Sequence, residues 1–391
     1  MSLENFFNPK SVAIVGASGQ KGKVGCEILK NMIDAGYKGK IFPINPKSET
    51  IEGLQCYADL AALGQTPDLV IIIVPAKIVP GIMQQCAQVG VKSVIIITAG
   101  FKEVGKAGRE LENQIVQIAR QAGIRIIGPN CLGLIVPANK LNASFGGNLP
   151  AAGAIGYLSQ SGALLTAILD MANANHIGFS KLVSIGNKAD VDEMDVIEAL
   201  ASDEDTKVIA GYLESIANGN QFVREAEQIS HDKPILLIKA GATEAGAKAA
   251  SSHTGSLAGA EAAYESAFER AGIIRCSSIG QQFDYAQAFA NQPLPAGPSV
   301  AVITNAGGPG IMAADAIEQQ GLTFARLTDK TIEKLSSGLP AAANLYNPVD
   351  VLGDALADRY EFALDAVLDD PHVDTVLVLL TPQAMTEPAA T

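Results

Sequence analysis

Short apolar runs alternate with longer amphipathic stretches along the first 150 residues. The runs are rich in β-branched residues and are apolar throughout, as in Leu69–Val74, rather than apolar at every second position. Strands of this kind, separated by helices, indicate a parallel sheet that is covered on both faces. The pattern predicts strands at Ser11–Val15, Lys40–Ile44, Leu69–Val74, Ser93–Thr98 and Arg125–Ile127, and helices at Gly25–Ala35, Gly81–Val89 and Arg109–Ala122.

The alternation continues through the rest of the chain. It predicts strands at Ile155–Ser159, Lys181–Ile185, Val208–Leu213, Pro234–Lys239, Ser299–Thr304 and Thr375–Leu380. It predicts helices at Ala163–Ala174, Val191–Ala201, Ala260–Ala271 and Ile311–Gln320. The helix at Val191–Ala201 is acidic, and we expect it to form a solvated face.

The pattern divides the chain into an α/β segment at 1–150, a second at 151–291 and a third at 296–391, with a proline-rich linker at 292–298. The third segment shows too few strands to form a stable doubly wound sheet by itself. We therefore expect this last domain to be partial.

Composition narrows the classes of function. Apolar residues make up 48% of the 391, yet no apolar run approaches the ~18 residues of a membrane span. The N-terminus resembles neither a signal peptide nor a transit segment. The net charge of −13 argues against a nucleic-acid-binding surface. Five scattered cysteines form no C-x-x-C pair, which fits reduced thiols in a cytoplasmic protein and offers no metal framework.

Glycine-rich turns follow the first predicted strand. The turn Gly16-Ala17-Ser18-Gly19 resembles a Rossmann phosphate loop, although its spacing is not G-x-G-x-x-G. A NAD site would place an acidic residue after the second strand. This chain has Lys47 there, which suits an extra phosphate such as that of coenzyme A, unless Lys47 is simply a solvated loop residue.

Two further strand ends carry unusual loops, Val74-Pro75-Ala76 and the stretch 128–133, which contains Asn130 and Cys131. Ligands of open α/β sheets sit at the carboxyl ends of the strands, where all these loops fall. Cys131 is either a packing residue, a neighbour of the ligand or a nucleophile, although the sequence shows no evident base for the last role.

Two strand-to-helix turns predict anion sites. Ser161 and Gly162 open the helix after Ile155–Ser159, and 305–310, Asn-Ala-Gly-Gly-Pro-Gly, opens the helix after Ser299–Thr304. Helix N-termini offer unpaired backbone donors and a positive dipole end. The alternative for Ser161 is an ordinary serine N-cap.

His253 is the histidine that packing explains least. It lies among small residues in the loop 251–259, between a predicted strand and a predicted helix, whereas the other three histidines occupy ordinary surface turns. We expect His253 to carry a phosphoryl group. Glu214, at the carboxyl end of a neighbouring strand, is placed to orient or stabilise that imidazole, or is a surface glutamate.

Together and in this order, these motifs resemble the NDP-forming acyl-CoA synthetases, the superfamily of succinyl-CoA synthetase and ADP-forming acetyl-CoA synthetase. The resemblance covers essentially the whole chain. It is carried by Gly16-Ala17-Ser18, Gly128-Pro129-Asn130-Cys131, Ser159-Gln160-Ser161-Gly162, Ser252-His253-Thr254-Gly255 and Asn305-Ala306-Gly307-Gly308-Pro309-Gly310.

The resemblance implies a Rossmann-like CoA-binding domain followed by two flavodoxin-like parallel-sheet ligase domains. It implies that His253 is phosphorylated and that Glu214 positions it. The implied phosphate contacts are Ser161, Gly162, Ala163, Gly307, Gly308 and Gly310. The implied CoA contacts are Gly16, Ala17, Ser18, Lys23, Lys47, Val74, Pro75, Ala76, Asn130 and Cys131.

The implied activity is an acid–CoA ligase that interconverts acyl-CoA, ADP and phosphate with a small carboxylic acid, CoA and ATP. Acetate is the family default. ATP or ADP and Mg²⁺ would bind to an ATP-grasp domain, which this sequence lacks, so we expect a fused segment or a partner subunit to supply it, and an oligomer. We favour the fused segment.

Three alternatives stay open. A regulatory or acyltransferase-linked protein of the same superfamily would sense acyl-CoA without transferring phosphate, although the presence of His253 and Glu214 favours catalysis. A NAD(P)-dependent oxidoreductase would explain the glycine turn but not the His253 loop. A plain CoA-binding module would use the first domain alone.

Overall fold

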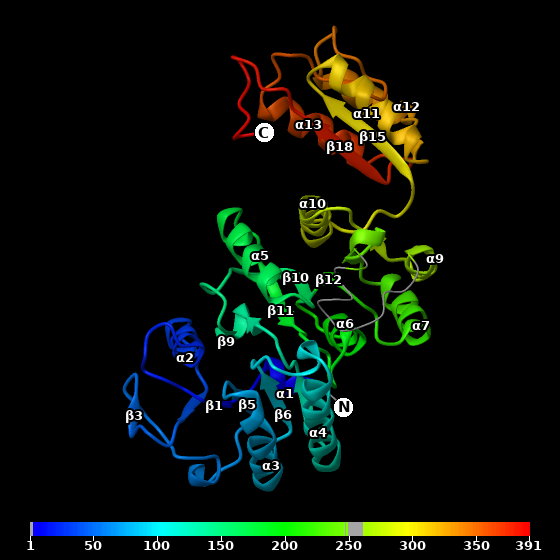
Figure 1. The fold of residues 1–391 in the computed structure, drawn as a ribbon. Coiled ribbons are helices and arrows are strands. Elements are labelled where there is room, and N and C mark those ends of the chain that lie inside the picture. The colour runs from blue at the N-terminus through cyan, green and yellow to red at the C-terminus, as the bar shows by residue number, and fades with distance from the viewer. Residues whose placement is uncertain (1–2, 247, 249–260) are drawn as a thin grey trace. The chain divides into compact units, whose positions relative to one another are not determined.

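The computed structural model describes residues 3–246, 248 and 261–391, which form two compact units, residues 1–292 and 293–391 (Figure 1). In the part of the chain that the structure describes, no helix combines the length and the apolar character needed to cross a membrane.

The first unit begins with a five-stranded parallel sheet in the order β2-β1-β5-β6-β7. Its strands are β1 (Ser11–Val15), β2 (Lys40–Ile44), β5 (Leu69–Ile72), β6 (Ser93–Ile96) and β7 (Arg125–Ile127), and a small hairpin, β3 (Thr50–Ile51) and β4 (Leu54–Gln55), follows β2. The buried parallel strands confirm the predicted Rossmann-like α/β domain. Their order corresponds to 2-1-3-4-5 within the sheet, the flavodoxin-like variant of the doubly wound arrangement.

Helices cover both faces of this sheet because alternate strand residues point to opposite sides. Val12 and Ile14 of β1 face one cluster of buried side chains, whereas Ala13 and Val15 face another. The first cluster includes α1 (Glu4–Phe7) and α2 (Val24–Asp34), and the second includes α3 (Val79–Val89) and α4 (Lys106–Ala122). The sheet is therefore buried on both sides, as its uniformly apolar strands predict.

The second sheet of this unit has seven strands in the order β14-β13-β12-β10-β11-β8-β9. Its strands are β8 (Gly133–Val136), β9 (Leu141–Ser144), β10 (Ala152–Ser159), β11 (Phe179–Ser184), β12 (Val208–Leu213), β13 (Ile235–Lys239) and β14 (Ile274–Arg275). β8 and β9 run antiparallel to their neighbours. The sequence pattern missed these two strands, so the sheet is mixed rather than purely parallel and begins before residue 150.

In the described part of the chain, five helices cover the second sheet. α5 (Gly162–Ala174) and α10 (Ile279–Asn291) pack on one face, and α6 (Glu193–Ala201), α7 (Gly219–Ser230) and α9 (Glu261–Arg270) contribute to the other. The prediction that the acidic α6 forms a solvated face is wrong in part. Glu193 is only 1% exposed, and Met194, Val196 and Ile197 are buried, because α6 packs its first turn against the sheet.

The second unit has a four-stranded parallel sheet built around β15. Its elements are β15 (Ser299–Thr304), β16 (Thr323–Phe324), β17 (Val349–Asp350), β18 (Thr375–Leu379), α11 (Gly307–Gln319), α12 (Asp329–Gly338) and α13 (Ala357–Leu368). The two-residue strands β16 and β17 are too short for a hydrophobic pattern to reveal. β18 pairs with β15 alone and leaves Leu377 and Val378 exposed.

Candidate functional site

The loops that follow the strands of the first sheet meet at one edge. The Gly16 N–H donates to Ile44 O over 3.0 Å, and the Asn45 side chain donates to Ala17 O over 2.8 Å. These two bonds join the ends of β1 and β2. Parallel strands bring their carboxyl ends to the same edge, so the predicted glycine turn and the predicted lysine loop are neighbours.

The same edge continues across β5 and β7. The Thr98 hydroxyl donates to Val74 O over 2.8 Å, and the Asn130 N–H donates to Thr98 O over 3.0 Å. Asn130 lies in the left-handed region at φ 58°, after the cis Gly128–Pro129 bond. The structure therefore brings together, along one edge, the backbone segments of every predicted CoA loop.

Glycine makes the turn after β1 possible. Gly16 has φ 94°, and a Cβ on Gly16 would lie 3.1 Å from Ile73 O. A Cβ on Gly25, in the first turn of α2, would lie 2.2 Å from Gly16 O. The helix therefore begins directly against the loop, which is the close strand–helix approach that dinucleotide-type phosphate loops use. The cradle fits a pyrophosphate-bearing ligand such as CoA.

Polar side chains surround this cradle. Ser18 is half-buried, and its hydroxyl accepts from the Gln20 N–H over 3.0 Å. Lys23 is the N-cap residue of α2, and Lys47 follows β2, where its N–H donates to Asn45 Oδ1 over 3.0 Å. Both lysine side chains are exposed, so both ammonium groups are available to a phosphate. Pro75 is exposed, and Val74 and Ala76 are half-buried beside it.

Cys131 is placed for packing rather than for chemistry. Cys131 is 4% exposed, and its Sγ lies 3.4 Å from Ile96 O. Burial raises the pKa of the thiol to about 12. A thiol in that state supplies almost no thiolate at neutral pH, so the geometry disfavours the nucleophile alternative and leaves only its backbone near the ligand edge.

The first predicted phosphate helix begins as the sequence indicates. Ser161 is the N-cap of α5, and its hydroxyl accepts from the Leu164 N–H over 3.3 Å. Ser159 Oγ accepts from the Ser161 N–H over 3.1 Å. Gly162 is half-buried and Ala163 exposed, so the first turn of α5 is open to a small anion. The N-cap and anion-site interpretations are compatible.

The second predicted phosphate helix, in the other unit, begins at Gly307 rather than at Ile311 as predicted, since Pro309 is tolerated in a first turn. Gly307 and Gly308 are exposed, and a Cβ on either would meet nothing within 4 Å. Gly310 differs. It is buried against Thr304 and Pro348, and its N–H donates to Ala306 O, so Gly310 fits a packing role rather than the predicted phosphate contact.

Glu214 follows β12 at the same edge as the start of α5. The Glu214 and Ser215 N–H groups both donate to Gln160 Oε1, over 2.9 and 3.1 Å. Gln160 Nε2 donates to Ser215 Oγ over 3.3 Å. Glu214 is half-buried. The predicted carboxylate and the predicted phosphate helix are thus tied together through Gln160, a residue for which the sequence pattern predicts no separate role.

His253 lies outside the described residues, as does the whole of the loop 251–259. The strand that leads into this loop, β13, pairs with β12 in the register Leu213↔Lys239. Lys239 is 7% exposed, its Nζ lies 4.2 Å from the centroid of the Tyr264 ring, and burial lowers the pKa of its ammonium. The sequence analysis missed Lys239, and its position at a strand's carboxyl end was the available signal.

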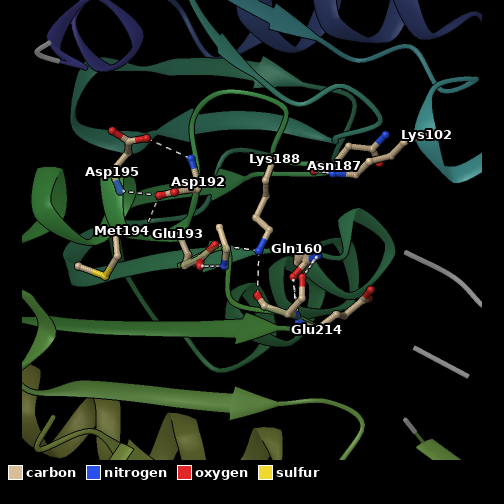
Figure 2. Close-up of polar contacts among 11 residues, drawn as sticks. Lys102, Gln160, Asn187, Lys188, Asp192, Glu193, Met194, Asp195 and Glu214 are labelled. Atoms are coloured by element: carbon tan, nitrogen blue, oxygen red, sulfur yellow. Dashed lines mark hydrogen bonds and ion pairs between the residues drawn. The ribbon is translucent and has the colours of Figure 1, made fainter. Parts of the chain in front are cut away.

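The connection from β11 to α6 joins this edge to the first sheet. The backbone N–H of Asn187 donates to Pro129 O over 2.8 Å. The side-chain amide of Asn187 donates to Glu103 Oε2 over 2.6 Å and to Glu112 Oε2 over 2.9 Å. Asn130 Nδ2 contacts Asn187 Oδ1 at 3.3 Å. The next residue, Lys188, reaches the Glu214 segment (Figure 2). The sequence pattern predicts neither the contacts of Asn187 nor those of Lys188.

Within residues 3–246, 248 and 261–391, no three His, Cys, Asp or Glu side chains converge as a metal site would require. A cavity of about 760 Å³ lies instead beside the amino end of β11, lined by Ser180, Lys181 and residues 202–205. That cavity is remote from the strand ends described above, and we assign it no part in the site.

Comparisons with protein families cover nearly the whole chain. Residues 10–137 match the CoA binding domain, residues 152–289 match the succinyl-CoA ligase like flavodoxin domain, and residues 300–390 match the ligase-CoA domain. These matches follow the order of the three sheets.

Individual proteins are similar at moderate to high identity. An acetate–CoA ligase (ADP-forming) I of Archaeoglobus fulgidus is 46% identical over 98% of this chain, which spans 55% of that protein. The alpha subunit of acetate–CoA ligase (ADP-forming) I of Pyrococcus furiosus is 43% identical over 99% of this chain, which spans 85% of the subunit. This chain thus spans about half of the first relative and most of the second.

A solved structure has the same fold. The acetyl-coenzyme A synthetase 1 of Ca. Korarchaeum cryptofilum, described as dinucleotide forming and solved with phosphate and ADP, matches with a TM-score of 0.94 and 40% identity. The match covers all of this chain and 84% of that chain.

Proposed function

The chain belongs to the NDP-forming acyl-CoA synthetase family, and from this premise we propose that it is the acyl-CoA-binding and phosphohistidine-carrying part of an ADP-forming acid–CoA ligase. The reaction is acyl-CoA + ADP + phosphate ⇌ carboxylic acid + CoA + ATP. The acid is small, and acetate is our first candidate. The observation that carries the proposal is the meeting of Glu214 and the α5 N-terminus at one sheet edge, beside the strand that leads to His253.

Two group transfers make up the part of the reaction that this chain performs. An oxygen of phosphate attacks the thioester carbonyl, the C–S bond breaks, and CoA leaves as a thiol with an acyl phosphate as the second product. The imidazole of His253 then attacks the phosphorus, and the carboxylate leaves. Nucleophilic relay of this kind replaces one difficult transfer with two easier ones.

The chain's own residues hold the charges that move. The Gly16–Ser18 turn with Lys23 and Lys47 binds the phosphates of CoA, Lys47 taking the 3′-phosphate, while the loops at 74–76 and 130–131 line the same edge. The first turn of α5, at Ser161–Ala163, offers backbone donors to the phosphoryl group. The first turn of α11, at Gly307–Gly308 in the other unit, has backbone donors of the same kind. Glu214 orients the imidazole.

ATP or ADP and Mg²⁺ belong to a further ATP-grasp segment or subunit, which would pass the phosphoryl group between phosphohistidine and nucleotide. We propose an oligomer without nucleic-acid or membrane partners. Because all five cysteines are buried free thiols, we also propose a cytoplasmic protein.

Labelling by acetyl phosphate tests the proposal. Wild-type protein incubated with acetyl phosphate that is radiolabelled in its phosphoryl group is expected to gain acid-labile label, and His253→Ala is expected to gain none. His231→Ala, at the C-cap of α7, is the matched control and is expected to label as wild type does. Equal labelling of wild type and His253→Ala would refute the relay.

Binding separates the alternatives. Titration calorimetry is expected to show binding of CoA and no tight binding of NAD. CoA binding without any histidine labelling would favour the regulatory acyl-CoA sensor, and NAD binding without CoA binding would favour the oxidoreductase.

A further inference from the structure

Polar side chains from two other parts of the chain bind the segment Glu214–Ala217, which follows β12. Gln160, which precedes the α5 N-cap, accepts from the N–H groups of Glu214 and Ser215. On the other side the segment meets the connection between β11 and α6 (Figure 2). The backbone that carries Glu214 is therefore fixed by side chains from two distant parts of the chain.

An ion pair provides the second support. Lys188 Nζ lies 2.8 Å from Glu193 Oε2 and donates to Ser215 O over 2.8 Å. The other oxygen of the same carboxylate, Glu193 Oε1, accepts from the Ala217 N–H over 2.5 Å. Each partner of the pair thus bonds the other partner and one backbone group of the Glu214 segment.

Burial of this pair is not explained by stability alone. The Lys188 side chain is 6% exposed and the Glu193 side chain 1% exposed. The cost of taking two charges out of water often equals or exceeds their mutual attraction, and a well-packed apolar pair of similar volume is commonly as stable. Lys188 also holds a left-handed backbone, φ 55°, which is unfavourable for a residue with a side chain. Both features suit a pair that fixes the position of something else.

We propose that Lys188 and Glu193 are positioning residues for Glu214, an inference that rests on the proposed phosphohistidine function. The pair holds the 215–217 backbone in one place, and Glu214 then meets the imidazole of His253 in the orientation that phosphoryl transfer needs. Outer residues that orient a catalytic group through hydrogen bonds act in this way in many sites. Neither residue touches the reacting atoms in this scheme.

The same connection also reaches the acyl-CoA edge. Gly186 packs against the 129–130 backbone, where a Cβ would lie 2.3 Å from Pro129 O, and Asn187 donates to that oxygen. Lys188 is the next residue. One short stretch, 186–193, therefore contacts the predicted CoA loop at one end and the Glu214 segment at the other, so the position of Glu214 is set relative to the acyl-CoA edge.

Substitution of Lys188 tests the inference. Lys188→Met removes the charge and both hydrogen bonds while keeping the length of the side chain. We expect the rate of His253 labelling by acetyl phosphate to fall about 10- to 100-fold, the loss typical for such supporting partners. The half-saturating acetyl phosphate concentration and the affinity for CoA should stay unchanged, because a misplaced orienting group affects the transfer step and not ground-state binding.

A matched control separates positioning from general stability. Lys181→Met removes a comparable ion pair, since Lys181 Nζ lies 2.5 Å from Asp203 Oδ2 and the two side chains are 11% and 17% exposed. Lys181 sits near the other end of β11, away from the Glu214 segment. This variant is expected to lose thermal stability to a similar degree and to label at the wild-type rate. Should Lys188→Met not fold, the isosteric Glu193→Gln carries the test, again with slower labelling.

The outcomes are distinguishable. Slow labelling in Lys188→Met or Glu193→Gln with wild-type labelling in Lys181→Met supports the positioning role. If wild type labels at His253 and Lys188→Met labels as fast as Lys181→Met, the inference is wrong and the proposed function stands. Absence of label in wild type overturns the proposed function and the inference with it.

Discussion

At the residue scale, small side chains decide how closely α2 approaches the loop after β1. A Cβ on Gly25 would lie 2.2 Å from Gly16 O, a distance that real Cβ contacts do not show. Neighbouring backbone atoms would have to move, and the loop that forms the CoA cradle would move with them. Gly81 offers a contrast in the first turn of α3, because a Cβ there would meet nothing within 4 Å.

We expect Gly25→Ala to destabilise the protein by about 1–3 kcal/mol, the usual cost of overpacking. Its affinity for CoA should fall as well. Gly81→Ala should be neutral or stabilising by up to about 1 kcal/mol, since alanine is the better helix former. Urea unfolding and CoA titration of both variants check this prediction, and equal behaviour of the two would contradict the close approach of α2 to Gly16.

The sequence located Glu214 but not the residues that hold it. A carboxylate directly after an apolar strand can be recognised from the sequence as a candidate site residue, because parallel strands end at a common edge. Lys188 and Glu193 reach the backbone of Ser215 and Ala217, more than 20 residues away, through a tertiary contact that no local pattern encodes. Glu193 instead resembled one more solvated charge in an acidic helix.

At the element scale, α5 and α10 start in the same way but at different places. Ser161 caps α5 and Ser278 caps α10, each hydroxyl accepting from the N–H three residues on, over 3.3 and 3.2 Å. Both helices have 13 residues and pack on the same face of the seven-stranded sheet. α5, however, begins beside Gln160 and the Glu214 segment.

Ser161→Ala and Ser278→Ala should therefore have one effect in common and one that differs. Each is expected to cost about 0.5–2 kcal/mol of stability, the usual loss for a serine N-cap. Ser161→Ala should in addition slow His253 labelling by about tenfold, because the first turn of α5 loses a hydrogen bond that fixes its donors. Thermal melts and labelling rates measure the two effects. Similar labelling in both variants would argue that the α5 N-terminus does not face the phosphoryl group.

Elements were predictable where an apolar run marks them. Five strands occupy the predicted residues, namely β1, β2, β7, β12 and β15. Buried parallel strands of this kind are recognisable in the sequence as apolar runs. β16 and β17 have two residues each, and the antiparallel pair β8 and β9 lies directly after an irregular loop, so pattern alone could not separate them from turns. The early start of α11 was hidden by its glycines and Pro309, which are typical of loops.

At the scale of the whole first unit, a small polar cluster joins the two sheets. Glu103, which follows β6, accepts from the Gly100 N–H over 2.5 Å and the Phe101 N–H over 3.1 Å through one oxygen, and from Asn187 Nδ2 over 2.6 Å through the other. Arg125 reinforces the junction through Asp190 and Asp195 at the start of the α6 region. Such contacts depend on tertiary structure and were not predictable from the sequence.

The hydrogen bonds make the Glu103 junction sensitive to acid. Burial alone would raise the pKa of Glu103, but the bonds from Asn187 and from the Gly100 and Phe101 backbone outweigh burial and hold the pKa below its usual value. A carboxyl group whose pKa is lower in the folded than in the unfolded state contributes stability above the unfolded pKa. That contribution is lost as the pH falls from the ordinary glutamate pKa, about 4.3, through the lower folded value.

We therefore expect wild type to be more stable than Glu103→Gln at pH 7, and the difference in melting temperature to shrink progressively below about pH 4, where Glu103 itself becomes protonated. Circular dichroism melts between neutral and acid pH measure the difference. Glu110→Gln, which removes the same charge at an exposed position of α4, is the matched control and should show little difference from wild type at either end of the range. If the difference in melting temperature between wild type and Glu103→Gln stays constant down to acidic pH, the contact between Glu103 and Asn187 does not depend on the ionised carboxylate. The two sheets of the first unit would then depend on contacts that carry no charge, such as the hydrogen bonds from Asn31 Nδ2 of α2 to Ser144 O and Gly146 O, over 2.9 and 2.7 Å.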